Sequence, residues 1–203
     1  MAGGVRLRPA ALPWAGLCAL AAGGALLAQA VDPALLRWQP ELALAQPWRW
    51  VSAAWVHLSP LHLGANLLGT ALVAALGMAA GCGRRAALAW ALAWPLTHLG
   101  LLAQPSLARY GGLSGVLHAG VAVACWQLLL GDMGRRRAIG AALTGGLVIK
   151  LLIEAPWQGP LRQVPGWDIA IAPLAHASGA AAGWLCALAC GVGAGPDRHG
   201  QPA

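Results

Sequence analysis

Residues 60–80 read PLHLGANLLGTALVAALGMAA, a run without a charged side chain that is long enough to cross a lipid bilayer as one helix. His62 and Asn66 stand near its start, four residues apart, and therefore lie on one face of that helix. Further long apolar runs follow along the chain. This pattern predicts an all-α protein embedded in a membrane.

The composition of the chain supports this fold class. Of its 203 residues, 59% are hydrophobic and only 9% are charged, whereas about 25% of residues are charged in a typical soluble domain. So few charged side chains argue against a soluble enzyme, a disordered tail or a nucleic-acid-binding module. In a membrane protein, the net charge of +7 is best interpreted through the positions of the basic residues.

We expect six membrane-spanning helices that form a single domain over residues 1–203. A span needs about 20 residues, so six of them leave room only for short loops. The breaks between runs carry Gly, Pro or charged residues, as turns require. The six runs cover about 11–30, 60–80, 86–104, 113–131, 138–155 and 173–193.

The first run also has a second interpretation. It ends in Ala28-Gln29-Ala30, which is similar to a signal-peptidase site, so a cleaved signal peptide is an alternative to a retained helix. We interpret it as the first helix because it is longer than a usual signal core. The segment that follows is expected to lie at the membrane interface, where Trp is enriched. Its tryptophans are Trp38, Trp48, Trp50 and Trp55.

The arginines predict the orientation of the helices. Six spans place both termini on one side, and basic residues favour the cytoplasmic side. The side of the termini holds Arg6, Arg8, Arg84, Arg85, Arg135, Arg136, Arg137 and Arg198. The opposite side holds only Arg37, Arg49, Arg109 and Arg162. We therefore expect cytoplasmic termini, with the second, fourth and sixth helices starting outside.

Each of these three helices carries polar residues near its start. Ser114 and His118 lie four residues apart in the fourth run, and His176 opens the sixth. Together with His62 and Asn66, they are expected at one depth in the outer leaflet. A serine and a histidine at equal depth can act as nucleophile and general base, if they come within about 3 Å of each other.

Small residues in the fourth and sixth runs would allow such an approach. They include Gly112, Gly115, Gly179 and Gly183. Acyl transfer also needs donors for the oxyanion, for which the Asn66 amide, the His62 ring and the Ser114 backbone N–H are candidates. Taken alone, each of these residues has an explanation in helix packing, which is the usual role of a serine in a glycine-rich membrane helix. Their joint pattern at one depth favours catalysis.

We expect neither a metal nor an organic cofactor. The five cysteines lack metal-ligand spacing and are interpreted as small buried hydrophobic residues. A small transporter is a different class of membrane protein. It would need intramembrane charges along a path or a repeat between its halves, and neither is seen in this sequence.

Over about 48–190, the chain resembles the rhomboid family of intramembrane serine proteases. The matching segments are Trp48-Arg49, His57, Leu61-His62-Leu63, Asn66-Leu67-Leu68, Tyr110-Gly111-Gly112-Leu113-Ser114-Gly115-Val116, and Ala175-His176-Ala177-Ser178-Gly179 with Gly183. The resemblance implies a Ser114–His176 dyad without a carboxylate, with His62, Asn66 and the Ser114 N–H as oxyanion donors. A non-enzymatic relative that binds proteins is the alternative. Such relatives usually lack the serine or the histidine.

One residue departs from the pattern of many rhomboids, which carry a tyrosine four residues after the serine. Here that residue is His118, and the run Gly112 to His118, the small size and the Lys150–Glu154 segment resemble rhombosortases. That subfamily is associated with proteins bearing a C-terminal Gly-Gly motif, an apolar helix and a basic cluster. The resemblance implies cleavage of this tail in a bacterial inner membrane, with water or a lipid-related amine receiving the new C-terminus. A general rhomboid protease for single-span membrane proteins is the alternative.

Two pairs of residues raise further hypotheses. His118 is expected either to hold the His176 ring, by hydrogen bonding or stacking, or to pack between helices. Lys150 and Glu154 lie one helical turn apart and can form an ion pair. That pair would either contribute to substrate choice or, as we favour, stabilise the helix.

Overall fold

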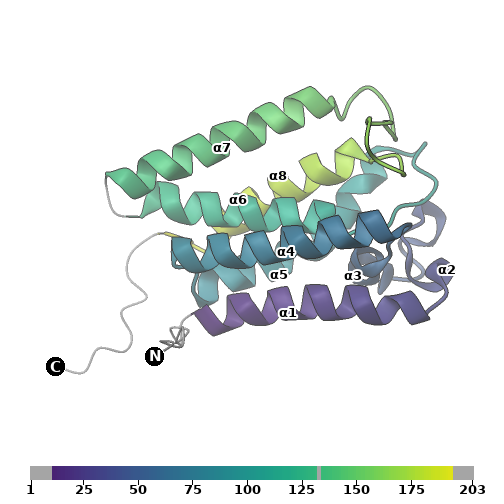
Figure 1. The fold of residues 1–203 in the computed structure, drawn as a ribbon, viewed down its shortest axis with the longest axis horizontal. Coiled ribbons are helices and arrows are strands. Elements are labelled where there is room, and N and C mark those ends of the chain that lie inside the picture. The colour runs from purple at the N-terminus through teal and green to yellow at the C-terminus, as the bar shows by residue number, and fades with distance from the viewer. Residues whose placement is uncertain (1–10, 132–133, 194–203) are drawn as a thin grey trace.

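The computed structural model describes residues 11–131 and 134–193, whose regular elements are helices joined by loops (Figure 1). The long helices in this part of the chain are α1 (Leu12–Leu27), α4 (Pro60–Ala80), α5 (Arg84–Leu99), α6 (Ser114–Leu130), α7 (Arg135–Glu154) and α8 (Pro173–Ala189). Between α1 and α4 lie the short elements α2 (Pro33–Leu36), η3 (Pro40–Leu42), α3 (Arg49–Ser52) and η4 (Ala53–Trp55). Two 3-10 turns, η2 (Ala28–Ala30) and η5 (Gly100–Ala103), extend α1 and α5.

These helices lie close to the predicted apolar runs, but three boundaries differ. α5 begins at Arg84 and α7 at Arg135, earlier than expected, because arginine forms helices well and its long side chain can reach polar surroundings from the first turn. α8 ends at Ala189 rather than near 193, because Gly191 has a φ of 62°, a left-handed conformation that ends helices.

Three of the helical segments are long and apolar enough to cross a membrane, covering Leu12–Ala30, Pro60–Ala80 and Arg84–Ala103. α6 is apolar but shorter, and α7 carries charged residues at both ends. The apolar helices fit a helical membrane bundle. The expectation that all six long helices span the bilayer stays a prediction.

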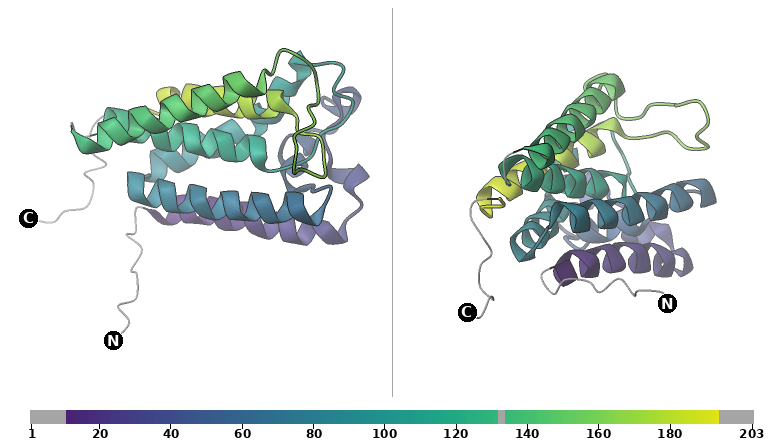
Figure 2. Two further views of the ribbon diagram at one scale, coloured as in Figure 1. Left: turned by 45° about the horizontal axis from the view of Figure 1, so that its top comes forward. Right: turned by 60° about the vertical axis from the view of Figure 1, so that its left-hand side comes forward.

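α6 lies at the centre of the bundle and packs against α4, α5, α7 and α8. α1 covers α4 and α5 on one side, whereas α7 lies at the opposite edge (Figures 1 and 2). α7 packs chiefly on α6 and only lightly on α8. α7 is therefore held in the bundle mainly through α6.

The packing of α6 on α8 depends on glycine. A Cβ atom on Gly179 would collide with the carbonyl oxygen of Gly115, and one on Gly183 would collide with the carbonyl oxygen of Ala119. The backbones of the two helices are thus in direct contact, as small residues allow in membrane bundles. This contact brings the first turns of α6 and α8 together.

The N-terminal ends of α4, α6 and α8 and the C-terminal end of α7 meet at one end of the bundle, together with α2 and α3 (Figure 1). Polar residues that are far apart in the sequence thereby share one level, as the predicted topology requires. The N-terminal ends of α5 and α7, which carry arginines, lie at the other end. Arg6, Arg8 and Arg198 lie outside the described residues.

Candidate active site

The segment before α6 is fixed by the loop that follows α1. Trp38 and Tyr110 exchange backbone hydrogen bonds of 2.9 and 3.0 Å, and the Gly112 N–H donates to the Ala53 carbonyl at 2.9 Å. Gly112 has a φ of 142°, a conformation that favours glycine. Burial raises the pKa of Tyr110, so its hydroxyl stays protonated and donates to the Gly112 carbonyl at 3.0 Å. These contacts set the start of α6 at Ser114.

Arg49 holds this loop together from inside. Its side chain is buried, and its guanidinium donates to the carbonyls of Ala34 and Arg37 and to the Gln46 side chain. A guanidinium can satisfy several acceptors at once. Arg49, singled out in the sequence together with Trp48, is therefore a structural support for the loop that positions the segment before Ser114.

Ser114 and His176 form the central contact of the site. Ser114 is the first residue of α6, and His176 lies in the first turn of α8. The Ser114 Oγ is 2.9 Å from the His176 Nε2, within the distance needed for proton transfer. The close approach expected between these two side chains is thus present in the structure.

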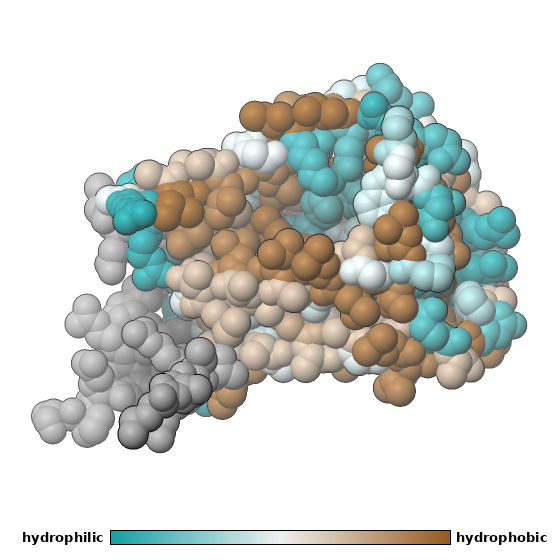
Figure 3. Space-filling model, in the orientation of Figure 1, coloured by the Kyte–Doolittle hydropathy of each residue, from teal (hydrophilic) through white to brown (hydrophobic). Residues whose placement is uncertain are grey.

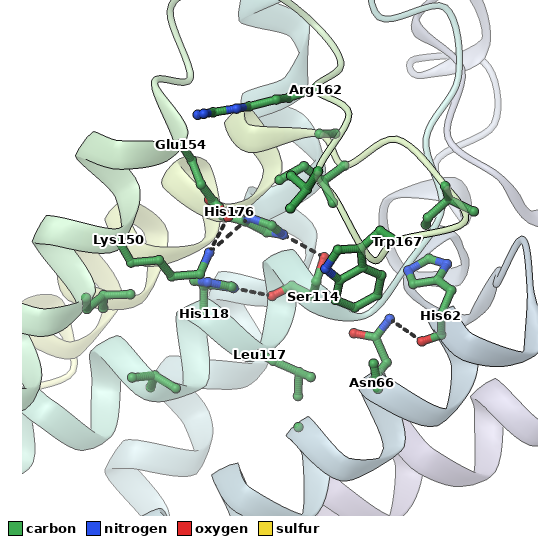
Figure 4. Close-up of a pocket in the computed structure, with 18 of the residues that line it drawn as sticks. His62, Asn66, Ser114, Leu117, His118, Lys150, Glu154, Arg162, Trp167 and His176 are labelled. Carbon is green, nitrogen blue, oxygen red and sulfur yellow. Dashed lines mark hydrogen bonds and ion pairs between the residues drawn. The ribbon is translucent and has the colours of Figure 1, made fainter.

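A carboxylate adjoins the other side of the His176 ring (Figure 4). The Glu154 Oε2 is 2.7 Å from the His176 Nδ1, and the Lys150 Nζ is 2.7 Å from the Glu154 Oε1. The rhomboid resemblance implies a dyad without a carboxylate, whereas in this structure the Glu154 carboxylate contacts His176. The C-terminal end of α7 reaches the level of the first turn of α8, which brings Glu154 to His176.

His118 stacks on His176. The ring centroids are 4.3 Å apart and the planes are inclined by 15°. The His118 Nδ1 lies 2.6 Å from the Ser114 carbonyl oxygen, which can only accept, so this nitrogen carries the proton. His118 thus stacks on His176 and donates a hydrogen bond to the backbone of Ser114.

Two substitutions distinguish the contribution of the stacking on His176 from that of the hydrogen bond to the Ser114 carbonyl. His118→Phe keeps a flat ring over His176 but loses one hydrogen bond, so we expect a loss of roughly fivefold in the rate of Ser114 labelling by a fluorophosphonate. His118→Ala also loses the stacking, and we expect a loss of roughly 50-fold. Equal rates for the two variants would contradict the stacking role, and a wild-type rate for His118→Phe would contradict the polar role.

His62 and Asn66 lie on α4, on the other side of Ser114 (Figure 4). The Leu58 N–H donates to the His62 Nδ1 at 3.3 Å, so the neutral ring carries its proton on Nε2. A Cβ atom on Gly112 would lie 2.8 Å from that Nε2, which shows how closely His62 approaches the segment before Ser114. The Asn66 Nδ2 donates to the His62 carbonyl at 3.1 Å, which uses one of its two hydrogens. Both side chains keep an N–H for a further acceptor.

These residues line a cavity of about 1210 Å³ between α4, α6, α7 and the loop before α8. In Figure 3 a hydrophilic recess opens between hydrophobic surfaces. Towards the other end of the bundle, the lining is apolar, with Leu72 and Leu76 from α4 and Leu143 from α7. Trp167 lies over the recess, and the Ser59 hydroxyl donates to Asp168 in the same loop at 2.9 Å. The cavity thus has an apolar part between α4 and α7 and a polar part at Ser114 and His176.

The site and the fold together define a helical membrane protein with a serine and a histidine in contact inside a cavity. The model of the rhomboid domain family matches residues 44–192. The match covers most of the chain, which therefore belongs to the rhomboid family, a family of intramembrane serine proteases. No match was found among curated proteins.

Proposed function

We propose that this protein is an intramembrane serine endopeptidase in which Ser114 is the nucleophile and His176 the general base. The observation that carries the proposal is the 2.9 Å contact between the Ser114 Oγ and the His176 Nε2. A serine hydroxyl is a weak nucleophile until a neighbouring base accepts its proton. The contact also argues against a non-enzymatic relative, for which no such pair is needed.

The proposed reaction follows from the two atoms in contact. The His176 Nε2 takes the proton of Ser114 while Oγ bonds to the carbonyl carbon of the substrate, whose oxygen becomes an oxyanion. The C–N bond then breaks, and the leaving amine takes the proton from Nε2. Water or an amine next attacks the acyl-enzyme with the help of His176, which releases the new C-terminus and restores Ser114.

The oxyanion needs hydrogen-bond donors around it. We assign this role to the His62 Nε2–H, the free N–H of the Asn66 amide and the backbone N–H of Ser114, with Gly112 leaving room for the His62 ring. The first N–H groups of a helix have no acceptor within that helix, so the first turn of α6 can offer one. His118 supports His176 from α6.

The cavity favours a substrate that is itself a membrane segment. Its apolar part between α4 and α7 suits a helix in the bilayer, and its polar end suits an extended segment at Ser114. Glycine forms helices poorly and offers no side chain to clash in the recess. A C-terminal tail in which Gly-Gly precedes an apolar helix and a basic cluster fits this division, and we propose it as the substrate of a rhombosortase-type enzyme.

We further propose that the active-site end faces outward in a bacterial inner membrane. Arg84, Arg85 and the three arginines at the start of α7 lie at the opposite end of the bundle. Basic residues favour the cytoplasmic side. The substrate's basic cluster would then also stay in the cytoplasm, with its Gly-Gly segment at the level of Ser114.

Co-expression with a reporter tests this function. The reporter ends in Gly-Gly, an apolar helix and a basic cluster; a matched reporter carries Leu-Leu in place of Gly-Gly. We expect the intact mass of the first reporter to fall by the mass of its tail with the wild-type enzyme. With Ser114→Ala, we expect this mass to stay unchanged. A mass above that of the free carboxylate would indicate transfer to an amine. Equal cleavage of both reporters would favour a general rhomboid protease, and cleavage by Ser114→Ala would contradict the proposed nucleophile.

A further inference from the structure

We propose that Glu154 is a positioning residue for His176, held in place by Lys150, so that the site works as a Ser–His–Glu triad. The inference rests on the proposed function, since it concerns the base of that reaction. It departs from the dyad without a carboxylate that the rhomboid resemblance implies.

The protonation of His176 supports this role. An ionised carboxylate only accepts hydrogen bonds, so the 2.7 Å contact with the Glu154 Oε2 places a proton on Nδ1. In the neutral ring, the lone pair then lies on Nε2, which faces the Ser114 Oγ at 2.9 Å. This is the tautomer that a general base for Ser114 requires. When Nε2 takes the serine proton, the carboxylate also stabilises the imidazolium.

Both oxygens of the Glu154 carboxylate have a partner. Oε2 contacts His176, and Oε1 accepts a hydrogen bond from the Lys150 Nζ at 2.7 Å. The two contacts together fix the orientation of the carboxylate towards His176. The Glu154 side chain is 15% exposed and that of Lys150 is 41% exposed. An isolated charge is costly within a bilayer, and the ammonium offsets the charge of the carboxylate.

Helix stability explains this pair poorly. A lysine that precedes a glutamate by four residues is the weaker order for a stabilising ion pair. Glu154 is the last residue of α7, where the helix dipole disfavours a negative charge. His176 lies in the first turn of α8, where the dipole disfavours a positive charge. Contact between Glu154 and His176 offsets both disadvantages when His176 is protonated, whereas the ion pair within α7 offsets only the charge of Glu154.

The other neighbours of His176 do not duplicate this role. His118 covers the face of the ring at 4.3 Å rather than its Nδ1 edge. The Lys150 Nζ is 3.2 Å from Nδ1, but an ammonium has no acceptor for the Nδ1 proton. Among the described residues, Glu154 is the acceptor recorded on Nδ1.

The test compares variants by the second-order rate of fluorophosphonate labelling in detergent. For Glu154→Gln we expect a loss of roughly 100- to 10,000-fold, because the amide can donate to Nδ1 and favour the wrong tautomer. Glu154→Asp should recover part of the rate. Lys150→Gln breaks the same ion pair but keeps the carboxylate on His176, so we expect less than about a tenfold loss.

The double variant Lys150→Met/Glu154→Gln distinguishes positioning from structure. It leaves no unpaired charge, so its thermal midpoint should lie near that of the wild type. If the pair is only structural, labelling should recover with stability; if Glu154 positions His176, labelling stays as low as in Glu154→Gln. With the cleaved reporter, we expect kcat to fall and KM to change little, whereas a role in substrate recognition would raise KM.

These outcomes separate the two proposals. Labelling of the wild type that persists in Ser114→Ala would overturn the proposed function itself. Labelling that depends on Ser114 but proceeds at the wild-type rate in Glu154→Gln would overturn the role of Glu154 alone. Equal losses in Glu154→Gln and Lys150→Gln, both recovered in the double variant, would also overturn it.

Discussion

Replacing His176 by alanine is expected to slow fluorophosphonate labelling of Ser114 by roughly 10,000-fold or more. The serine proton then has no acceptor at 2.9 Å, and the hydroxyl remains a weak nucleophile. The measurement is the labelling rate of purified protein in detergent, with circular dichroism to show that the helices are retained.

Chemical rescue provides the control for this variant. The cavity of about 1210 Å³ opens beside Ser114, and the alanine leaves a gap where the imidazole ring was. We expect added imidazole to restore part of the labelling in His176→Ala and to leave Ser114→Ala unlabelled. A wild-type rate in His176→Ala without imidazole would contradict the assignment of the base.

Gly179→Ala is the second substitution with a large expected effect. Its new Cβ atom would meet the Gly115 carbonyl, a backbone atom that cannot turn aside. Overpacking of this kind costs about 1–3 kcal/mol, which corresponds to a fall of roughly 2–12 °C in the thermal midpoint. Separation of α6 from α8 also moves His176 away from Ser114, and a displacement of about 1 Å can lower the rate roughly 100-fold.

Gly16→Ala is the matched control for this substitution. Gly16 lies in α1, and no atom lies within 4 Å of the position of its Cβ. Alanine is the better helix former, so the thermal midpoint should stay the same or rise, with unchanged labelling. Equal destabilisation by the two substitutions would contradict the role of glycine at the contact between α6 and α8.

Much of this arrangement could be predicted from the sequence. Apolar runs and turn residues located the six long helices, because the bilayer imposes a length and a polarity on each span. The alternation of helix direction placed the starts of α4, α6 and α8 at one end. The closeness of Ser114 and His176 followed from that topology and from the glycines.

The contact of Glu154 with His176 was missed, although a signal was available. α7 runs opposite to α8, so its C-terminal end had to reach the level of the first turn of α8. A charged residue at that level needs a partner, and the spacing within α7 indicated only Lys150, four residues earlier. The side-chain directions of two neighbouring helices decide such a contact, and periodicity within one helix does not give them.

The loop before α4 shows a second limit of sequence reasoning. Its tryptophans indicated a segment at the membrane interface, but not that Trp38 pairs with Tyr110 or that Arg49 holds the carbonyls of Ala34 and Arg37. These contacts join segments distant in sequence. They depend on irregular backbone whose path no repeat or period describes.

The most direct test of the proposed function is to locate the fluorophosphonate adduct by tandem mass spectrometry of the digested, labelled protein. We predict one adduct per chain, on Ser114, which is absent from the His176→Ala variant after the same exposure. An adduct on another serine, such as Ser178 two residues after His176, or folded protein without an adduct on Ser114, would contradict the assignment of Ser114 as the nucleophile.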